Sequence, residues 1–249
     1  MCIALGDPKK NRERAASLIE EACRRGSKFV VLPELWTTGY SLKNIRELAE
    51  PLDEATGTML LDICSKWKTY VIGSIAESRE GKIFNTATII GPKGLLGSYS
   101  KVHLFRLLGE HECFTHGNSC SVFQTDFGKV GLALCYDIRF PELTRKLALN
   151  KAQILFVPAE WPYLRGAHWE LLLKARAIEN QIFVVGANRV GSDENNTFFG
   201  HSMILDPMGK VLIEGGDTEL ILTCELDMDL IDKTRSLITC FKDRRPALY

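Results

Sequence analysis

Three chemically reactive side chains follow strand-like runs of apolar residues in this sequence. A β-branched run that begins at Lys28 ends at Glu34, a second run leads to Lys101, and the apolar run 129–134 leads to Cys135. Strand interiors seldom hold such polar groups unless they are paired, and α/β proteins commonly place their sites at strand ends. The three residues are therefore candidates for one site that combines a carboxylate, an ammonium group and a thiol.

Together these three residue types can hydrolyse an amide through a covalent intermediate. A glutamate beside a cysteine can take the thiol proton and later activate the water that hydrolyses the thioester. A lysine can stabilise the negative charge that develops on the substrate oxygen. Taken singly, each residue also has an ordinary structural explanation, because a lone cysteine at a strand end is usually core and a lone Glu or Lys usually belongs to a solvated edge.

The surroundings of Cys135 predict a reactive thiol. The residue lies between a buried strand and the expected start of a helix. A helix N-terminus and a nearby lysine both stabilise a thiolate, so we expect a lowered pKa for this cysteine.

The elements that must position these residues alternate along the chain. Apolar residues recur at helical spacing between Asp7 and Arg25, with Pro8 at the first position and Gly26 as the stop. Further helices are expected at 58–67, from about 141, and at 166–180. Strands are expected at 28–34, 69–76, 84–90, 95–100, 129–134, 153–158, 182–187, 202–205, 210–214 and 220–226.

The order of these elements predicts one domain. Residues 106–120 are expected to be irregular, but strands and helices otherwise alternate without a composition break, linker or internal repeat. This pattern indicates a single α/β domain over residues 1–249, with sheets covered by helices.

The composition excludes several classes of partner. Thirty-one Lys and Arg balance 31 Asp and Glu, so no basic field attracts nucleic acid or an anionic membrane, and a small molecule or a protein is the expected partner. No run approaches the roughly 18 apolar residues of a membrane span, and the first residues do not resemble a signal peptide. We therefore expect a cytoplasmic protein whose eight scattered cysteines are mostly reduced.

Three segments resemble the signature sequences of the nitrilase superfamily of carbon–nitrogen hydrolases, and they occur in the same order. The segments are Leu32-Pro33-Glu34, the run from Ser100 to Phe105, and the run from Leu134 to Glu142. The resemblance extends over nearly the whole chain. It implies a four-layer αββα sandwich, a Glu34–Lys101–Cys135 triad, and hydrolysis of non-peptide carbon–nitrogen bonds without a metal or an organic cofactor.

The same resemblance implies two further catalytic groups. Members of the superfamily carry a second glutamate, in the loop after the lysine, that orients the lysine and the substrate. Glu110 is the best match, with Glu112 or neither as the alternative. The backbone N–H of Tyr136 is implied as a second donor to the substrate oxyanion.

Within the superfamily, the sequence is most similar to bacterial omega-amidases. The segments around residues 103–106, 109–111, 168–181 and 186–191 carry this resemblance. It implies hydrolysis of the terminal amide of 2-oxo acids such as 2-oxoglutaramate, with release of ammonia.

Such a substrate carries a carboxylate, which a planar guanidinium can hold with two hydrogen bonds. Arg139 matches the position that faces the carboxylate in similar enzymes, and Arg106 and Arg189 are weaker candidates. The alternative for Arg139 is an ion pair with Asp137 or Glu142.

Trp161 is expected to line the substrate pocket, because the loop that contains it lies beside the nucleophile in the superfamily. Its alternative is an ordinary aromatic residue of the core, since large aromatic side chains contribute strongly to core packing.

The beginning of the chain departs from the superfamily pattern. Other members open with a buried strand before the segment that corresponds to Gly6-Asp7-Pro8, and here only four apolar residues, 2–5, precede it. The first strand is therefore expected to be missing or shortened, through a late start or because another segment takes its place. A sheet without this strand would expose unpaired backbone groups.

Several other functions remain as rivals. The same triad could act on N-carbamoyl compounds, nitriles or deaminated-peptide amides, or the chain could be a catalytically silent binding protein. None of the five histidines has a partner at metal-ligand spacing, which argues against a zinc site. A homodimer or larger homo-oligomer is expected, with the apolar residues at 237–241 and 247–249 as a candidate interface.

Overall fold

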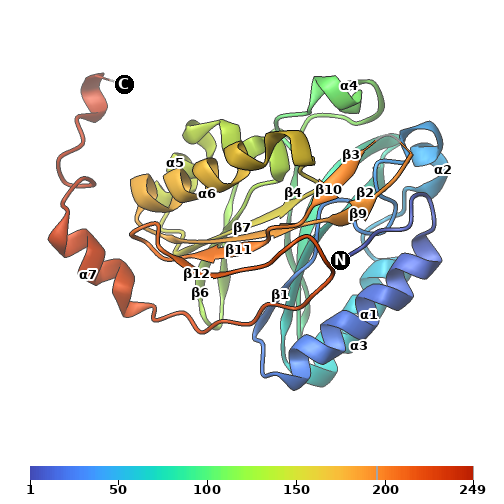
Figure 1. Ribbon diagram of the computed structural model, residues 1–249, viewed down its shortest axis with the longest axis horizontal. Helices are drawn as coiled ribbons and strands as arrows, with labels where there is room; N and C mark the ends of the chain where they lie inside the picture. The colour runs from blue at the N-terminus through green and yellow to red at the C-terminus, as the bar shows by residue number, and fades with distance from the viewer. Residues whose placement is uncertain (195, 249) are drawn as a thin grey trace.

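The computed structural model describes residues 1–194 and 196–248, and it consists of two β-sheets packed face to face between two layers of helices (Figure 1). The first sheet is covered by the two helices drawn in blue and cyan, and the second by two helices near the middle of the chain. The expected four-layer αββα sandwich is confirmed.

The first sheet contains four strands in the order β1-β2-β3-β4. Their bounds are β1 (Phe29–Val31), β2 (Tyr70–Arg79), β3 (Lys82–Gly91) and β4 (Gly94–Ser100). β1 is parallel to β2, and the other pairs are antiparallel hairpin neighbours. Helices α1 (Pro8–Arg24) and α3 (Ala55–Trp67) cover the outer face of this sheet.

The second sheet contains six strands in the order β12-β11-β8-β7-β6-β5. Their bounds are β5 (Val122–Thr125), β6 (Gly128–Leu132), β7 (Ile154–Ala159), β8 (Phe183–Asn188), β11 (Met203–Leu205) and β12 (Val211–Glu214). The central strands β6, β7 and β8 are parallel, as expected when helices connect them. Helices α5 (Pro141–Leu149) and α6 (Gly166–Asn180) cover the outer face.

Short elements complete the chain. They are η1 (Leu42–Asn44), α2 (Ile45–Leu48), η2 (Arg106–Leu108), α4 (Glu110–Cys113), η3 (Cys135–Arg139), η4 (Tyr163–Arg165), β9 (Val190–Ser192), β10 (Thr197–Phe199), α7 (Asp229–Leu237) and η5 (Pro246–Leu248). The segment 106–120, predicted to be irregular, thus includes a short helix, α4, that begins at Glu110.

Two apolar cores hold the layers together. Between the sheets, side chains such as Ile72 and Ile89 of the first sheet pack in the same cluster as Phe156 and Phe183 of the second. Under the helices, Ile19 of α1 and Ile63 of α3 pack against the other face of the first sheet. Successive side chains of a strand point to opposite faces of the sheet, so one strand contributes side chains to both cores.

Helix α1 begins where the sequence predicted. The Asp7 side chain accepts a hydrogen bond from the backbone N–H of Lys10, and Pro8 occupies the first turn. Within the first turns of α1, the side chain of Asn11 donates hydrogen bonds to the carbonyl oxygens of Ala4 and Thr37, which holds the segment that precedes the helix. The N-terminal residues form one isolated parallel bridge, between Cys2 and Val190, and Ile3 is buried.

Two strand predictions were wrong in part. The run 28–34 was predicted as a strand buried within a sheet, but β1 covers only Phe29–Val31, lies at the edge of its sheet and is half-buried. Residues 220–226 were predicted as a strand and have no ladder partner among the described residues. Both errors concern pairing, which depends on neighbours far away in the sequence.

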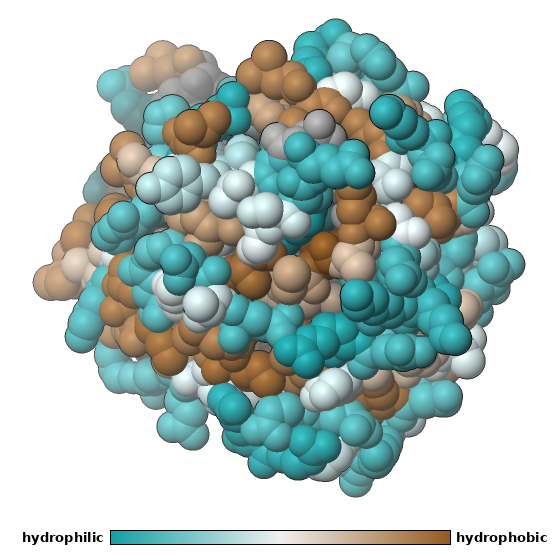
Figure 2. Space-filling model, turned by 45° about the vertical axis from the view of Figure 1, so that its right-hand side comes forward, coloured by the Kyte–Doolittle hydropathy of each residue, from teal (hydrophilic) through white to brown (hydrophobic). Residues whose placement is uncertain are grey.

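The surface of the molecule carries both apolar and polar residues. Figure 2 shows that apolar residues gather in a band across the lower and central part of one face, whereas polar residues dominate its rim. Within residues 1–194 and 196–248, no helix is long and apolar enough to cross a membrane.

Candidate active site

Glu34 lies in a tight turn immediately after β1. The backbone of Leu32 still pairs with β2 through the carbonyl of Ile72, and the chain then turns at Leu35, which has a left-handed φ of 42°. The N–H of Leu35 donates to the hydroxyl of Ser74, a residue of β2. A non-glycine residue in this conformation costs about 1–3 kcal/mol, so the surrounding hydrogen bonds must hold the turn. The result is a fully buried Glu34 carboxylate.

Lys101 lies at the end of β4, and its side chain is also fully buried. Its Nζ donates to Oε1 of Glu34 at 2.7 Å and to the two carboxylate oxygens of Glu110 at 2.8 and 2.9 Å. A buried ammonium group is tolerated only when it is paired with an opposite charge and hydrogen-bonded. The carboxylates of Glu34 and Glu110 do both.

Glu110, the first residue of α4, fixes the lysine from the opposite side. Its carboxylate accepts hydrogen bonds from the hydroxyl of Tyr40 at 2.7 Å, from the amide of Asn85 at 3.3 Å and from the backbone N–H of Phe105. Asn85 of β3 also donates to Glu34 at 2.9 Å, so one amide group joins the two carboxylates. The structure therefore brings Glu110, rather than Glu112, to Lys101.

Cys135 begins the short helix η3, just after β6. It has a left-handed φ of 41°, and it is 7% exposed, which leaves its thiol at the bottom of a pocket. The turn is held by the buried carboxylate of Asp137, which accepts hydrogen bonds from the N–H of Leu134 and the hydroxyl of Tyr99. A residue in this sharp turn projects its side chain away from the sheet.

Asp137 also connects the cysteine turn to the lysine segment. Its second oxygen accepts the backbone N–H of His103 at 3.1 Å and lies 2.8 Å from the imidazole Nδ1 of the same residue. The His103 ring stacks on Phe140, with ring centres 3.7 Å apart. These contacts fix the position of Lys101 relative to Cys135 although the two residues belong to different sheets.

The electrostatics of Cys135 differ from the sequence expectation. Burial raises the pKa of its thiol well above the usual value, and Glu34 raises it further, while Lys101 only partly opposes them. The expected lowering by a helix N-terminus and a lysine was wrong, because the helix is a short 3₁₀ turn and the site is closed to solvent. The raised pKa favours the neutral thiol of Cys135 over the thiolate.

Lys101 keeps its charge. Burial alone would lower the pKa of its ammonium group, but Glu110 and Glu34 raise the pKa above the usual value. A permanent positive charge at this position can interact with a developing oxyanion but cannot take a proton. Of the buried ionisable groups in contact with Lys101, the carboxylates are therefore left to act as the base.

A small pocket of about 10 Å³ opens beside the thiol and is lined by Tyr40, Phe105, Leu108, Cys135, Tyr136, Arg139, Glu160, Trp161, Pro162 and Arg165. The guanidinium of Arg139 lies over the Trp161 ring, 4.6 Å from its centre. That of Arg165 lies over Phe105 at 5.5 Å. Two cations that lie over aromatic rings therefore border the space next to the Cys135 thiol.

The residues that were predicted to bind the substrate do not all lie at the pocket. Arg139 and Trp161 line the pocket, and no ion pair of Arg139 with Asp137 or Glu142 is found in the part of the chain that the structure describes. Arg106, by contrast, is exposed and is not among the pocket residues. Arg189, the other weaker candidate, is fully buried and pairs with Glu160 at 2.7 Å and Asp193 at 2.9 Å.

Glu160 holds the carboxylate of Glu34 through a backbone hydrogen bond. Its backbone N–H donates to Oε2 of Glu34 at 3.1 Å, and its own carboxylate binds Arg189. Burial raises the pKa of Glu160 to about 8, with Arg189 opposing the shift. Arg189 also reaches the carbonyl of Ile3 at 3.3 Å, so this network joins the N-terminal residues to the site.

Four site residues escaped the sequence analysis: Tyr40, Asn85, Glu160 and Arg165. Glu160 and Arg165 lie close to Trp161 in the sequence. Because Trp161 was expected to line the pocket, its neighbours could have been predicted as site residues as well. Tyr40 and Asn85 gave no such signal, because an isolated Tyr or Asn has many ordinary roles.

In the part of the chain that the structure describes, no group of three or more His, Cys, Asp or Glu side chains is arranged to hold a metal ion.

Comparison with known proteins identifies close relatives. The family model described as carbon-nitrogen hydrolase matches residues 1–236. The chain is 41% identical to a 2-oxoglutaramate amidase of Bacillus subtilis over 99% of this chain and 96% of that protein. It is 36% identical to the omega-amidase NIT2 of Xenopus tropicalis, over 96% of this chain and 91% of the relative. The crystal structure of Saccharomyces cerevisiae Nit3, a member of branch 10 of the nitrilase superfamily, matches with a TM-score of 0.91 and 32% identity, over 98% of this chain and 93% of that one.

The raised pKa of Cys135 predicts an unusual alkylation profile. Iodoacetamide reacts with thiolates, so Cys135 should react slowly at neutral pH, and its rate should still be increasing above pH 9. Mass spectrometry of the peptide that contains Cys135, after timed alkylation across a pH series, measures this rate. A rate that reaches its plateau below pH 8 would contradict the raised pKa.

Changing Glu34 to Gln should shift this profile to lower pH. The substitution removes the negative charge that helps to raise the thiol pKa, so alkylation of Cys135 at pH 8 should become several-fold faster. Glu77→Gln is a matched control, because Glu77 is a buried carboxylate of β2 that bonds to Thr86 and Arg79 instead.

Proposed function

Because the chain belongs to the carbon–nitrogen hydrolase family, we propose that it is a cysteine-dependent amidase that hydrolyses the terminal amide of small 2-oxo acids such as 2-oxoglutaramate. The observation that carries the proposal is the buried Glu34–Lys101–Glu110 network beside the thiol of Cys135. The amidase names of the relatives from Bacillus subtilis and Xenopus tropicalis support the substrate class.

In the first half of the reaction, the Cys135 sulfur attacks the amide carbonyl carbon while Glu34 takes the thiol proton. A neutral thiol beside a carboxylate suits this concerted transfer, because a free thiolate would be disfavoured in so buried a site. The carbonyl oxygen becomes an oxyanion. The Nζ of Lys101 and the N–H of Tyr136, which has no partner within η3 at this position, are the proposed donors to it.

In the second half, the tetrahedral intermediate collapses and the carbon–nitrogen bond breaks. Glu34 returns its proton to the nitrogen, ammonia leaves, and the acyl group remains on Cys135 as a thioester. Glu34 then takes a proton from water, whose oxygen attacks the thioester carbon, and the sulfur leaves with that proton. Glu110 stays in place throughout and keeps Lys101 charged and correctly oriented.

The substrate carboxylate is proposed to bind Arg139. This guanidinium lies over the Trp161 ring at the pocket wall, and a guanidinium can form two parallel hydrogen bonds to a carboxylate. Arg165 borders the same pocket and is a second cation for the same end of the substrate. Amides without a carboxylate would leave these charges unpaired, which favours omega-amides over simple amides.

The enzyme is also proposed to be cytoplasmic and homo-oligomeric. A thiol nucleophile needs a reducing compartment, and the eight cysteines are unpaired in the structure. Leu164, Leu171 and Ile178 form a stripe at seven-residue spacing along η4 and α6, and they are 88%, 67% and 53% exposed. An apolar stripe on the outer helical layer favours self-association of two copies. The interface expected at 237–241 and 247–249 stays a second candidate, since Leu237 and Leu248 are exposed; residue 249 lies outside the described residues.

Replacement of Cys135 by Ala should abolish hydrolysis. Without the nucleophile, ammonia release from 2-oxoglutaramate should fall by at least roughly a thousandfold, because the groups of a covalent mechanism act as a unit. Cys224→Ala is the control, since Cys224 is partly exposed and is not among the pocket residues, and it should keep full turnover. Undiminished turnover of the Cys135 variant would refute the mechanism.

Replacement of Arg139 by Gln should weaken binding of the carboxylate-bearing substrate. A lost charge-assisted pair is worth about 1.5–3 kcal/mol, so KM for 2-oxoglutaramate should rise about 10- to 100-fold. Turnover of butyramide, which has no carboxylate, should change little. Arg106→Gln is the matched control, because Arg106 is exposed and outside the pocket. The assignment is wrong if Arg106→Gln raises KM and Arg139→Gln does not.

Replacement of Leu171 by Glu should produce a monomer. A charge in the centre of the apolar stripe would be buried without a partner in any complex formed through it. Light scattering after size-exclusion chromatography gives the mass, and Leu95→Glu, a change at an exposed residue of β4, serves as the control. A wild-type protein that is monomeric at micromolar concentration would exclude this interface.

A further inference from the structure

Glu160 lines the pocket beside the Cys135 thiol, and one of its carboxyl oxygens is unpaired. The residue is 1% exposed, and its Oε2 accepts a hydrogen bond from Arg189 at 2.7 Å. Its Oε1 is buried and has no hydrogen-bond partner among the residues that the structure describes. An unpaired buried oxygen is costly, so we expect it to meet a donor that the described residues do not supply.

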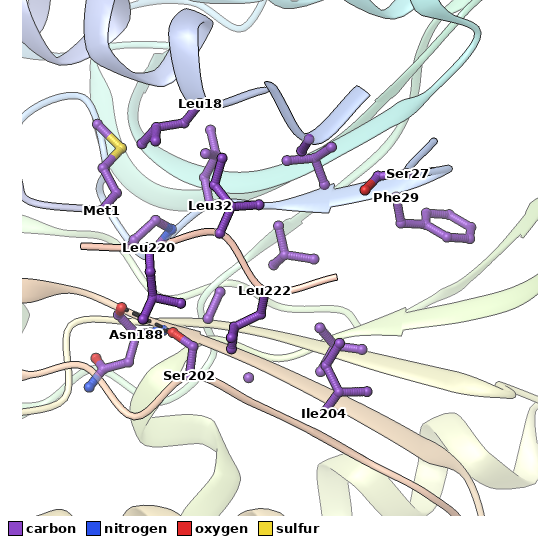
Figure 3. A pocket seen from close by; sticks show the side chains of 18 of the residues that line it. Met1, Leu18, Ser27, Phe29, Leu32, Asn188, Ser202, Ile204, Leu220 and Leu222 are labelled. Carbon is purple, nitrogen blue, oxygen red and sulfur yellow. Dashed lines mark hydrogen bonds between the residues drawn. The ribbon is translucent and has the colours of Figure 1, made fainter. Parts of the chain in front are cut away.

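The loop that carries Glu160 is held at two successive residues. The N–H of Glu160, just after β7, donates to Oε2 of Glu34 at 3.1 Å. The N–H of Trp161 donates to Oδ1 of Asn188 at 2.7 Å, and Nδ2 of Asn188 donates to the Trp161 carbonyl at 3.2 Å. Figure 3 shows Asn188 beside Ser202, whose hydroxyl bonds to the Asn188 backbone. The backbone at Glu160 is therefore fixed relative to the catalytic glutamate.

Most polar groups around the thiol are hydrogen-bond donors. The Nζ of Lys101 and the N–H of Tyr136 are the proposed donors to the substrate carbonyl oxygen, and the guanidinium groups of Arg139 and Arg165 cannot accept a hydrogen bond. A primary amide, however, also carries two N–H groups on its nitrogen, and these need acceptors. The pocket therefore supplies many partners for the amide oxygen and few for the amide nitrogen.

The free oxygen of Glu160 is the acceptor best suited to that nitrogen. The Oδ1 of Asn85 is also buried and without a partner among the described residues, but Asn85 is not a pocket residue. The hydroxyl of Tyr40 does line the pocket, but it donates its proton to Glu110, and a neutral hydroxyl is a weaker acceptor than a carboxylate.

We propose that Oε1 of Glu160 accepts an N–H of the substrate amide and holds its nitrogen while the carbon–nitrogen bond breaks. The proposal rests on the amidase function given above. The amide nitrogen keeps its two hydrogens and takes a third from Glu34, so positive charge develops on it before ammonia leaves. A carboxylate oxygen beside this nitrogen stabilises that charge in the transition state. Glu160 itself neither gains nor loses a proton in the step.

This contact favours amides over esters. In an ester of the same acid, an oxygen with lone pairs replaces the NH2 group, so two acceptors would face each other. A site that is built to bind an N–H group rejects an analogue that lacks it, because the polar group of the protein is then left unpaired.

The preference for amides depends on the ionisation of Glu160. Burial raises its pKa to about 8, Glu34 and Asp193 add to the shift, and Arg189 opposes it. Because Oε2 faces the Arg189 donor, the proton that is bound below this pH occupies Oε1 and turns it into a donor. Oε1 is thus an acceptor only above about pH 8, so the preference for the amide should increase as the pH rises through this value.

The other pocket groups do not change charge in the same range. Burial raises the pKa of Tyr40 and of Cys135 well above their usual values, so both remain largely neutral. The guanidinium groups of Arg139 and Arg165 stay charged.

The test compares amide and ester hydrolysis by the wild-type protein and by Glu160→Gln at pH 9. Arg189 can only donate, so the new side chain must turn its carbonyl oxygen to Arg189 and its NH2 group to the pocket. A donor then meets the amide nitrogen. Relative to the ester in which a methoxy group replaces the NH2 of 2-oxoglutaramate, kcat/KM for 2-oxoglutaramate should fall at least about tenfold. Release of the acid measures both reactions, after subtraction of the rate without protein.

Asp193→Asn is the matched control. Asp193 pairs with the same Nη1 of Arg189 at 2.9 Å and is not a pocket residue, so this change also removes one negative charge from the network around Arg189. A purely structural effect lowers both reactions together. The amide-to-ester ratio of kcat/KM should therefore stay at the wild-type value in this variant.

A pH series gives a second readout that needs no variant. Because kcat/KM reports ionisation in the free enzyme, the amide-to-ester ratio of the wild-type protein should rise between about pH 6 and pH 9. In Glu160→Gln the ratio should be independent of pH. Ionisation of the Cys135 thiol affects both substrates, so it cancels in the ratio.

Two results would overturn the role of Glu160 alone: an unchanged amide-to-ester ratio in a folded Glu160→Gln protein, or a wild-type ratio that does not vary with pH. If circular dichroism shows that the Gln variant does not fold, the wild-type pH series decides. A wild-type protein that hydrolyses neither compound would contradict the amidase function itself, and the role of Glu160 with it.

Discussion

The buried ammonium group of Lys101 imposes the strongest constraint on this molecule. It lies between the carboxylates of Glu34 and Glu110, and all three side chains are fully removed from solvent. Such a cluster is stable only if nearly every polar atom is paired, since removal of one partner leaves an uncompensated buried charge. The hydroxyl of Tyr40, the amide of Asn85 and the N–H groups of Phe105 and Glu160 supply those partners. The two sheets must therefore be packed in one specific arrangement before the cluster can form.

The same enclosure determines the chemistry of the thiol. A solvent-exposed cysteine near a lysine would ionise readily, but here burial outweighs the lysine and keeps the proton on sulfur. In the proposed mechanism, the carboxylate of Glu34 therefore takes the thiol proton during the attack rather than before it. Leu35, which follows Glu34, and Cys135 both have a left-handed φ, so the chain turns sharply at both residues. Each such residue costs about 1–3 kcal/mol, which the surrounding structure must offset.

Sequence alone predicted the parts of the structure that depend on local pattern or on a recognisable motif. Helix 166–180 and the strand runs before Lys101 and Cys135 were expected, and so was the proximity of Lys101 to Glu34 and Glu110. The sign of the thiol pKa shift was not, because burial is a property of the assembled layers. The strand at 220–226 was also mispredicted, because an alternating pattern does not by itself supply a pairing partner, and these residues have none among those that the structure describes. Tyr40 and Asn85 could be recognised only once the fold had placed them beside charged groups.

The hydrogen-bonded path from Ile3 to Glu34 has a consequence for how the position of this carboxylate depends on the rest of the fold. Ile3 bonds to Arg189, Arg189 to Glu160, and Glu160 to Glu34. This support of Glu34 therefore depends on segments that are far apart in the sequence, so it forms only when the fold has brought them together. A substitution at Arg189 would thus disturb the Glu34 carboxylate without contacting it.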